Sequence, residues 1–141
     1  MHRIPFLMLG GVLCVIAAVL HLAIIIGGEN WYRYFGAGER MALMAARGDI
    51  YPTIVTIFIA CVLFVWSLYA FAGAGLIPKL PFTKFCLCAI SAIFFVRGFG
   101  ALVAMPFMPQ IQTTFMFWSS LLVLFYFIAF AFGTYFNWKR L

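Results

Sequence analysis

Long stretches without charged side chains constrain this chain more than any other feature. Residues 5–26 and 50–78 contain no Asp, Glu, Lys or Arg, and after Phe85 the single charge before Lys139 is Arg97. The hydrocarbon core of a bilayer is roughly 30 Å thick, and a helix needs about 20 apolar residues to cross it. Each uncharged stretch is therefore long enough to span a membrane.

Prolines divide the last stretch into two helix-length pieces at Pro106 and Pro109. The chain thus predicts four transmembrane helices, at about residues 5–26, 50–73, 82–105 and 114–136. Only 9% of its 141 residues are charged and 67% are hydrophobic, whereas a soluble domain carries about 25% charged residues. We expect an all-α, polytopic membrane protein, a four-transmembrane-helix bundle forming a single domain over residues 1–141. The first helix is expected to be retained rather than cleaved as a signal peptide.

The connection between the first two predicted helices is the longest in the chain. Its interfacial segment, about residues 29–48, begins with an aromatic cluster formed by Trp31, Tyr32, Tyr34 and Phe35. Amphipathic rings settle at the headgroup level of a membrane. Residues 39–47 then predict a short helix that ends at Gly48. We expect this segment to lie in the membrane interface and to cap the bundle.

The positions of the basic residues predict the orientation. The net charge is +6, but no basic cluster typical of a nucleic-acid site occurs, and no nucleic-acid partner is expected. Five basic residues fall on one predicted side and three on the other: Arg3, Lys79, Lys84, Lys139 and Arg140 against Arg33, Arg40 and Arg47. The positive-inside rule therefore predicts that both termini are cytoplasmic.

Arg97 is the most informative polar residue. It precedes Met105 by eight positions, which places it about 12 Å below the outer end of its helix. A charge at that depth costs on the order of 3 kcal/mol unless it finds water or an acceptor. Glu29 and Asp49 flank neighbouring helices on the same predicted side, and His21 lies just below that surface. We expect a polar outer pocket formed by His21, Glu29, Asp49 and Arg97 and covered by Trp31, Tyr32 and Tyr34.

Two interpretations of this polar cluster are open. In the structural one, Arg97 pairs with Asp49 or Glu29, and His21 bonds a backbone carbonyl or a hydroxyl. In the functional one, Arg97 holds an anionic or carbonyl-bearing ligand, such as a lipid headgroup or a quinone, and His21 contributes a hydrogen bond.

Small residues predict which helix faces meet in lipid, because they allow backbones to approach closely. The first helix has such a stripe at Gly10, Cys14, Ala17 or Ala18, and His21. The second has Thr53, Thr56, Ala60 and Ser67. On the third, Arg97 shares its side with Gly100, Ala101 and Ala104.

The sequence names no reaction. The four cysteines, Cys14, Cys61, Cys86 and Cys88, lie within or beside predicted helices and are expected to be apolar thiols rather than disulfide or metal ligands. A paired-histidine haem site would need a partner for His21. No nucleotide-binding loop, zinc motif or serine elbow occurs. We predict no catalytic residue and no metal site, and the sequence leaves any cofactor unknown.

One stretch resembles known proteins. The segment from His21 to Met41, together with Ile50-Tyr-Pro-Thr, resembles small four-helix bacterial inner-membrane proteins that are themselves uncharacterised. The resemblance covers about the first half of the chain and implies a bacterial cytoplasmic membrane. The chain is also similar to small multidrug exporters in length and helix number, but its first helix lacks the carboxylate of their proton-coupled members.

Three functions follow as hypotheses. In the leading one, the outer polar pocket binds a lipid-like or other small ligand, or docks a partner. In the second, the chain is a subunit of an oligomeric small-molecule transporter or channel. In the third, it is an accessory subunit of a larger membrane complex. Membrane lipid is an expected partner in all three.

Overall fold

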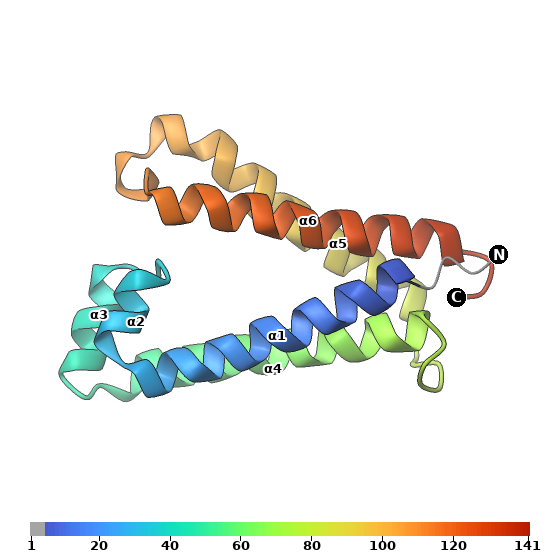
Figure 1. Cartoon of the computed structure of the whole chain (residues 1–141), viewed down its shortest axis with the longest axis horizontal. Helices are drawn as coiled ribbons and strands as arrows, with labels where there is room; N and C mark the ends of the chain where they lie inside the picture. The colour runs from blue at the N-terminus through green and yellow to red at the C-terminus, as the bar shows by residue number, and fades with distance from the viewer. Residues whose placement is uncertain (1–4) are drawn as a thin grey trace. The chain divides into compact units, whose positions relative to one another are not determined.

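The computed structural model describes residues 5–141, without the side chain at position 110. Arg3, which entered the predicted orientation, lies outside the described residues. The chain forms six α-helices and two short 3-10 turns in this range (Figure 1). In chain order they are α1 (Pro5–Gly27), α2 (Glu29–Tyr34), α3 (Glu39–Ala46), α4 (Ile50–Gly73), α5 (Thr83–Ala104), η1 (Met105–Phe107), η2 (Pro109–Ile111) and α6 (Thr114–Asn137). The predicted all-α fold, a bundle of four long apolar helices, is confirmed.

Helices α1, α4, α5 and α6 are each long and apolar enough to cross a membrane, so the chain is a multi-pass membrane protein. Their ends lie within a few residues of the predicted ones. The start of α6 is fixed by Thr113, whose side chain accepts a hydrogen bond from the backbone N–H of Met116 at 3.0 Å. Such a cap satisfies one of the free N–H groups of a first helical turn. The connection between α1 and α4 contains two short helices, where only the second was predicted.

The described residues form two compact units. The connector unit is Cys14–Val65 and contains α2 and α3. The hairpin unit contains the described residues up to Leu13 together with Trp66–Leu141, and is built around α5 and α6. The assignment of the whole chain to one domain stays a prediction.

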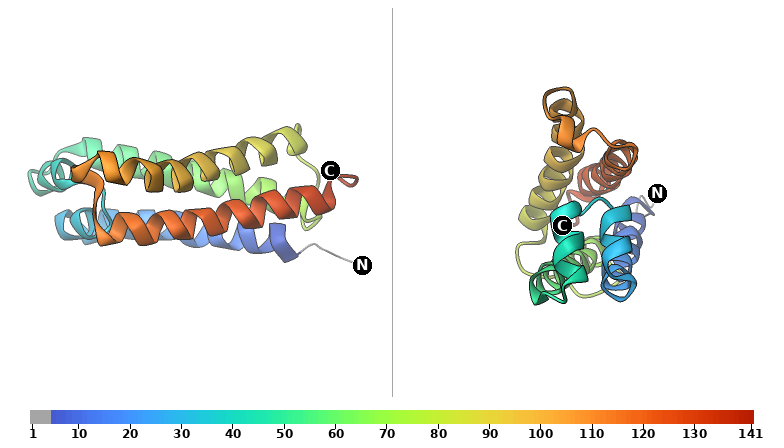
Figure 2. Two further views of the ribbon diagram at one scale, coloured as in Figure 1. Left: turned by 90° about the horizontal axis from the view of Figure 1, so that it is seen from above. Right: turned by 90° about the vertical axis from the view of Figure 1, so that its left-hand side faces the viewer.

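In the hairpin unit, α5 and α6 run side by side and antiparallel (Figures 1 and 2). The ring of Phe94 is central to their packing, with ring centroids 5.1 Å from Trp66, 5.2 Å from Tyr126 and 5.4 Å from Phe130. Close approach of the two helices depends on Gly98, where an added Cβ would lie 2.8 Å from Cγ of Leu124. Small residues thus bring these helices together, as expected in lipid.

The first turns of α1 also belong to the hairpin unit. Leu7 is fully buried, and a Cβ added at Gly133 would lie 2.7 Å from its Cγ. The ring of Phe6 packs at 6.3 Å from that of Phe132. The Tyr126 hydroxyl donates a hydrogen bond to the carbonyl of Leu13 at 2.8 Å. The start of α1 is therefore held by residues from the last helix.

The connector unit has a small core of its own, in which Ile24, Tyr32 and Ala42 are buried. Figure 2 shows α2 and α3 side by side at the ends of α1 and α4. The Tyr32 hydroxyl lies 3.1 Å from Oγ1 of Thr56, which in turn donates to the carbonyl of Pro52 at 2.7 Å. Since the threonine proton is used, Tyr32 is the donor to Thr56. This hydrogen bond ties α2 to α4.

The predicted helix faces are confirmed on two helices and wrong on a third. Cys14 and Ala18 of α1 are buried, and so are three predicted residues of α4, namely Thr56, Ala60 and Ser67. On α5, however, Arg97 and Gly100 are exposed, and the buried side includes Leu87, Phe94 and Gly98. The contact is made by a different face of α5, on which Leu87 and Phe94 lie together with Gly98.

Candidate functional site

The carboxylate of Glu29 is paired inside the connector unit. Arg33 on α2 donates from Nε to Oε2 of Glu39 at 2.8 Å and from Nη2 to Oε1 of Glu39 at 2.9 Å. Its Nη1 lies 3.3 Å from Oε1 of Glu29. These hydrogen bonds lower the pKa of Glu39 and raise that of Arg33. The guanidinium therefore joins α2 to the start of α3.

His21 and Asp49 lie in different surroundings. Nδ1 of His21 is 2.7 Å from the carbonyl of Ala17, so that nitrogen carries a proton and donates it. This is the backbone bond that the structural interpretation predicts. Asp49 is exposed and lines a depression of about 460 Å³ with Arg40 and Arg47.

Arg97 belongs to the hairpin unit, whereas the other three predicted site residues belong to the connector unit. Its side chain is exposed, and Nη2 lies 3.5 Å from Sδ of Met116. A thioether is a weak acceptor, so the guanidinium keeps most of its donors available. The pocket formed by all four predicted residues stays a prediction.

The aromatic residues predicted to cover that pocket divide into two kinds. Tyr32 is only 3% exposed and is a core residue of the connector unit. Trp31 and Tyr34 are 42% and 73% exposed. Both pack their rings against Phe35, at 5.7 Å and 5.1 Å. Tyr32 therefore stabilises the core of the connector unit, and Trp31 and Tyr34 form an exposed aromatic surface suited to a membrane interface.

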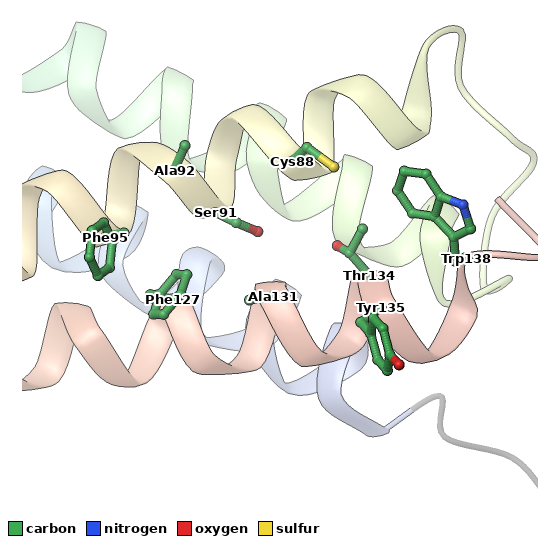
Figure 3. Close-up of a pocket in the computed structure, with 9 residues that line it drawn as sticks. All are labelled: Cys88, Ser91, Ala92, Phe95, Phe127, Ala131, Thr134, Tyr135 and Trp138. Carbon is green, nitrogen blue, oxygen red and sulfur yellow. The ribbon is translucent and has the colours of Figure 1, made fainter.

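A groove between α5 and α6 is the cavity in which polar groups converge on an apolar wall (Figure 3). Its volume is about 460 Å³. Each helix contributes one face, because the lining residues recur at three- and four-residue steps. They are Cys88, Ser91, Ala92 and Phe95 from α5, and Phe127, Ala131, Thr134 and Tyr135 from α6, with Trp138 just after it.

Two hydroxyls lie at the floor of this groove. The Ser91 hydroxyl donates to the carbonyl of Leu87 at 2.7 Å. Thr134 is 4% exposed, and its Oγ1 has no hydrogen-bond partner among the described residues. In Figure 3 the two hydroxyls turn toward one another across the groove. A buried hydroxyl left unpaired costs about 1–3 kcal/mol, so Thr134 has a donor to offer a ligand.

One end of the groove is basic and aromatic. Nζ of Lys84 lies 5.1 Å from the ring centroid of Trp138, a cation–π contact. A second depression, of about 750 Å³, is lined by Tyr135, Phe136, Trp138, Lys139 and Arg140. It shares Tyr135 and Trp138 with the groove. No acidic residue occurs in residues 66–141, so these cations have no carboxylate side chain within that sequence.

Sequence reasoning missed the groove. The signals that were available are small residues on facing helices, Ala92 and Ala131, and a tryptophan beside a lysine at the helix ends. Neither shows which faces of α5 and α6 meet. The four cysteines are free, and within residues 5–141 no three His, Cys, Asp or Glu side chains gather as a metal site would require.

Comparisons with protein-family models, with curated proteins and with solved structures found no match for this chain. The resemblance to small bacterial inner-membrane proteins therefore stays a prediction.

Proposed function

We propose that this multi-pass membrane protein binds a lipid-like ligand whose alkyl chain lies in the groove between α5 and α6. The observation that carries the proposal is a buried, unpartnered hydroxyl, Thr134 Oγ1, on the wall of an otherwise apolar groove. Ligand sites in general are mostly apolar cavities with a few placed polar groups, with volumes of roughly 300–1,000 Å³. The groove, at about 460 Å³, has that size and that composition.

The length of the groove supports an alkyl chain. The lining residues on α6 and its C-cap run from Phe127 to Trp138, eleven steps that correspond to about 16 Å along the helix axis. One leaflet of a bilayer has a hydrocarbon thickness of about 15 Å, half of the core. A single acyl or isoprenoid chain would therefore follow the groove from the headgroup region to the middle of the membrane.

The outer polar cluster is a separate hypothesis for the same class of function. In it, His21, Glu29, Asp49 and Arg97 would bind a small ligand or a partner at the outer surface. The pairing of Glu29 with Arg33 supplies an internal partner for one of its members, which favours the groove as the ligand site. Substitution of Arg97 with Gln tests the outer cluster, because it should abolish binding there while the folded protein is retained.

We also propose a bacterial cytoplasmic membrane as the location, with both termini inside. Lys84, Lys139 and Arg140 lie at one end of the hairpin unit. The positive-inside rule places such a basic end on the cytoplasmic side. The groove would then open from the inner leaflet.

Native mass spectrometry of the purified protein in mild detergent tests the groove. Phosphatidylcholine and phosphatidylglycerol are added, and the lipid that stays bound is counted. Ala131→Trp places a large ring in the groove and should remove bound lipid of both kinds. Ile128→Trp is the matched control, since residue 128 is 42% exposed on α6 and does not line the groove.

Equal lipid retention by Ala131→Trp, Ile128→Trp and the unaltered protein would contradict the proposal. Helical content and thermal unfolding of each variant are measured in the same detergent, so that loss of folded protein is recognised. If Ala131→Trp does not fold, Ala131→Leu, a smaller filler, takes its place.

A further inference from the structure

We infer that the ligand of the α5–α6 groove is an anionic phospholipid, with one acyl chain along the groove and its phosphate at Lys84. The inference rests on the proposed function, because it requires the groove to hold the chain. It adds the chemical class of the headgroup and names the residue that selects it.

Lys84 lies next to the mouth of the groove, where it contacts the lining residue Trp138. It precedes Cys88 by one helical turn, and residues four apart lie on the same face of a helix. Its side chain is half-buried, and its Nζ lies 5.1 Å from the centroid of the Trp138 ring. The contact with the ring uses charge rather than a hydrogen-bond acceptor, so the ammonium keeps its N–H donors for a phosphate oxygen.

The depth of Thr134 matches the layout of a phospholipid. Thr134 is four residues before Trp138, so its hydroxyl lies about 6 Å deeper than the mouth. In a phospholipid the ester carbonyls lie between the phosphate and the acyl chains. A cation, a free hydroxyl donor and an apolar wall follow one another along the groove in the order of phosphate, ester and chain. This order is the geometric basis of the inference.

Charge complementarity favours an anionic headgroup over a zwitterionic one. The segment 66–141 contains five basic residues and no acidic one, so no carboxylate side chain in it would pair with a choline or ethanolamine cation. Lys139 and Arg140 line the depression that continues from the mouth through Tyr135 and Trp138. A headgroup with net negative charge meets only cations there.

A general attraction of basic residues to an anionic leaflet is the competing explanation. Lys79 separates the two, because its Nζ donates to the backbone carbonyl of Arg140. It lines a different depression, which meets the headgroup depression at Lys139 and Arg140 but does not include Tyr135 or Trp138. Lys84→Gln and Lys79→Gln remove the same charge from the same unit, but only the first removes a group from the mouth of the groove.

The experiment compares the apparent Kd values of dioleoyl phosphatidylglycerol and dioleoyl phosphatidylcholine, measured by native mass spectrometry in a mild detergent. The unaltered protein should prefer phosphatidylglycerol. Lys84→Gln should weaken phosphatidylglycerol binding by about fivefold or more, as expected for loss of one cation near a lipid phosphate. Phosphatidylcholine binding should change less. Lys79→Gln should leave the preference for phosphatidylglycerol intact. Lys84→Arg, which keeps the positive charge that Lys84→Gln removes, should retain this preference as well.

Equal affinity for the two lipids, with both lost in Ala131→Trp, would overturn the headgroup inference while supporting the proposed function. Equal weakening by Lys79→Gln and Lys84→Gln would also overturn it, in favour of general electrostatic attraction. Binding that is unaffected by Ala131→Trp would overturn the proposed function itself. Thermal unfolding of every variant shows whether the comparison is made on folded protein.

Discussion

One cation of the connector unit, Arg33, has carboxylate partners within its unit, whereas two cations of the hairpin unit, Lys84 and Arg97, have none among the described residues. Arg33 binds the carboxylates of Glu29 and Glu39. Among the described residues of the hairpin unit, Arg97 contacts a thioether and Lys84 contacts the face of an aromatic ring. Ion pairs that satisfy each other leave little to attract a ligand, while unneutralised cations favour an anion.

Two threonine hydroxyls, one in each unit, also differ in their partners. Thr56 donates to Pro52 and accepts from Tyr32, so its hydrogen-bonding capacity is used inside the connector unit. Thr134 has no partner within the described part of the chain. Buried polar groups are paired in most proteins, and an exception calls for an explanation. The unpaired hydroxyl of Thr134 is therefore the feature of the hairpin unit on which the proposed ligand site depends.

The largest expected effect tests the claim that the connector unit is held by its own core. Tyr32→Ala should lower the free energy of unfolding by about 3–5 kcal/mol, the usual cost of truncating a large buried aromatic side chain. Thermal unfolding in mild detergent measures the loss. Tyr34→Ala is the control and should have little effect, because Tyr34 is 73% exposed. Similar losses of unfolding free energy for the two variants would contradict the distinction between Tyr32 as a core residue and Tyr34 as a surface residue.

A smaller effect is expected in the hairpin unit, which close packing holds together. A Cβ added at Gly98 would lie 2.8 Å from Cγ and 3.1 Å from the backbone nitrogen of Leu124, while at Gly100 nothing lies within 4 Å. Gly98→Ala should therefore destabilise the protein by about 1–3 kcal/mol through overpacking. Gly100→Ala on the same helix should be neutral or slightly stabilising. The reverse order in thermal unfolding would refute this packing of α5 on α6.

A matched pair of threonine variants sharpens the comparison directly. Thr56→Val leaves the Tyr32 hydroxyl without its acceptor and should destabilise by about 1–2 kcal/mol. Thr134→Val removes a hydroxyl that has no partner, and should leave stability unchanged or raise it. The same substitution should reduce lipid retention. If Thr134→Val destabilises as much as Thr56→Val, the hydroxyl of Thr134 has a structural role.

The smallest effect concerns pH. The hydrogen bonds from Arg33 hold the pKa of Glu39 below its ordinary value. The carboxylate therefore stabilises the contact of α2 with α3 above the unfolded-state pKa of about 4.3. This contribution is lost as the pH falls through the lower pKa of the folded state. Amide-exchange protection factors in residues 29–46 should fall on acidification below that range. Arg33→Gln should lower protection at neutral pH and flatten this dependence.

The membrane-spanning helices could be predicted from the sequence because the physical signal is strong. Twenty apolar residues without a charge have few alternatives to a membrane helix, and α1, α4, α5 and α6 follow from that rule. The helix α2 was missed because six residues give no readable periodicity. Its stability comes from the burial of Tyr32 and from the ion pair of Arg33 with Glu39. Both are contacts with residues outside α2 and cannot be inferred from helix propensity.

The candidate site was beyond the reach of sequence reasoning for a different reason. Arg97 was predicted to be a site residue because a charge within an apolar stretch is costly. Thr134, by contrast, is an ordinary polar residue in an apolar helix until its lack of a partner is known. The face that α5 turns to α6 was also mispredicted, since small residues mark close approach but not which neighbour is approached. Pairing of helices is a property of the whole chain.

The burial of Leu7 has a consequence for biogenesis. Leu7 and Phe6 are among the first described residues to be synthesised, yet they pack against Gly133 and Phe132 near the end of the chain. A nascent chain must therefore hold the beginning of α1 in lipid, or against an insertion factor, until α6 has entered the membrane. Residues 14–65, by contrast, can complete their contacts while translation continues. In ribosome-bound chains that end before residue 114, Tyr32 should already make its native contacts, whereas Leu7 should lack its contacts with α6.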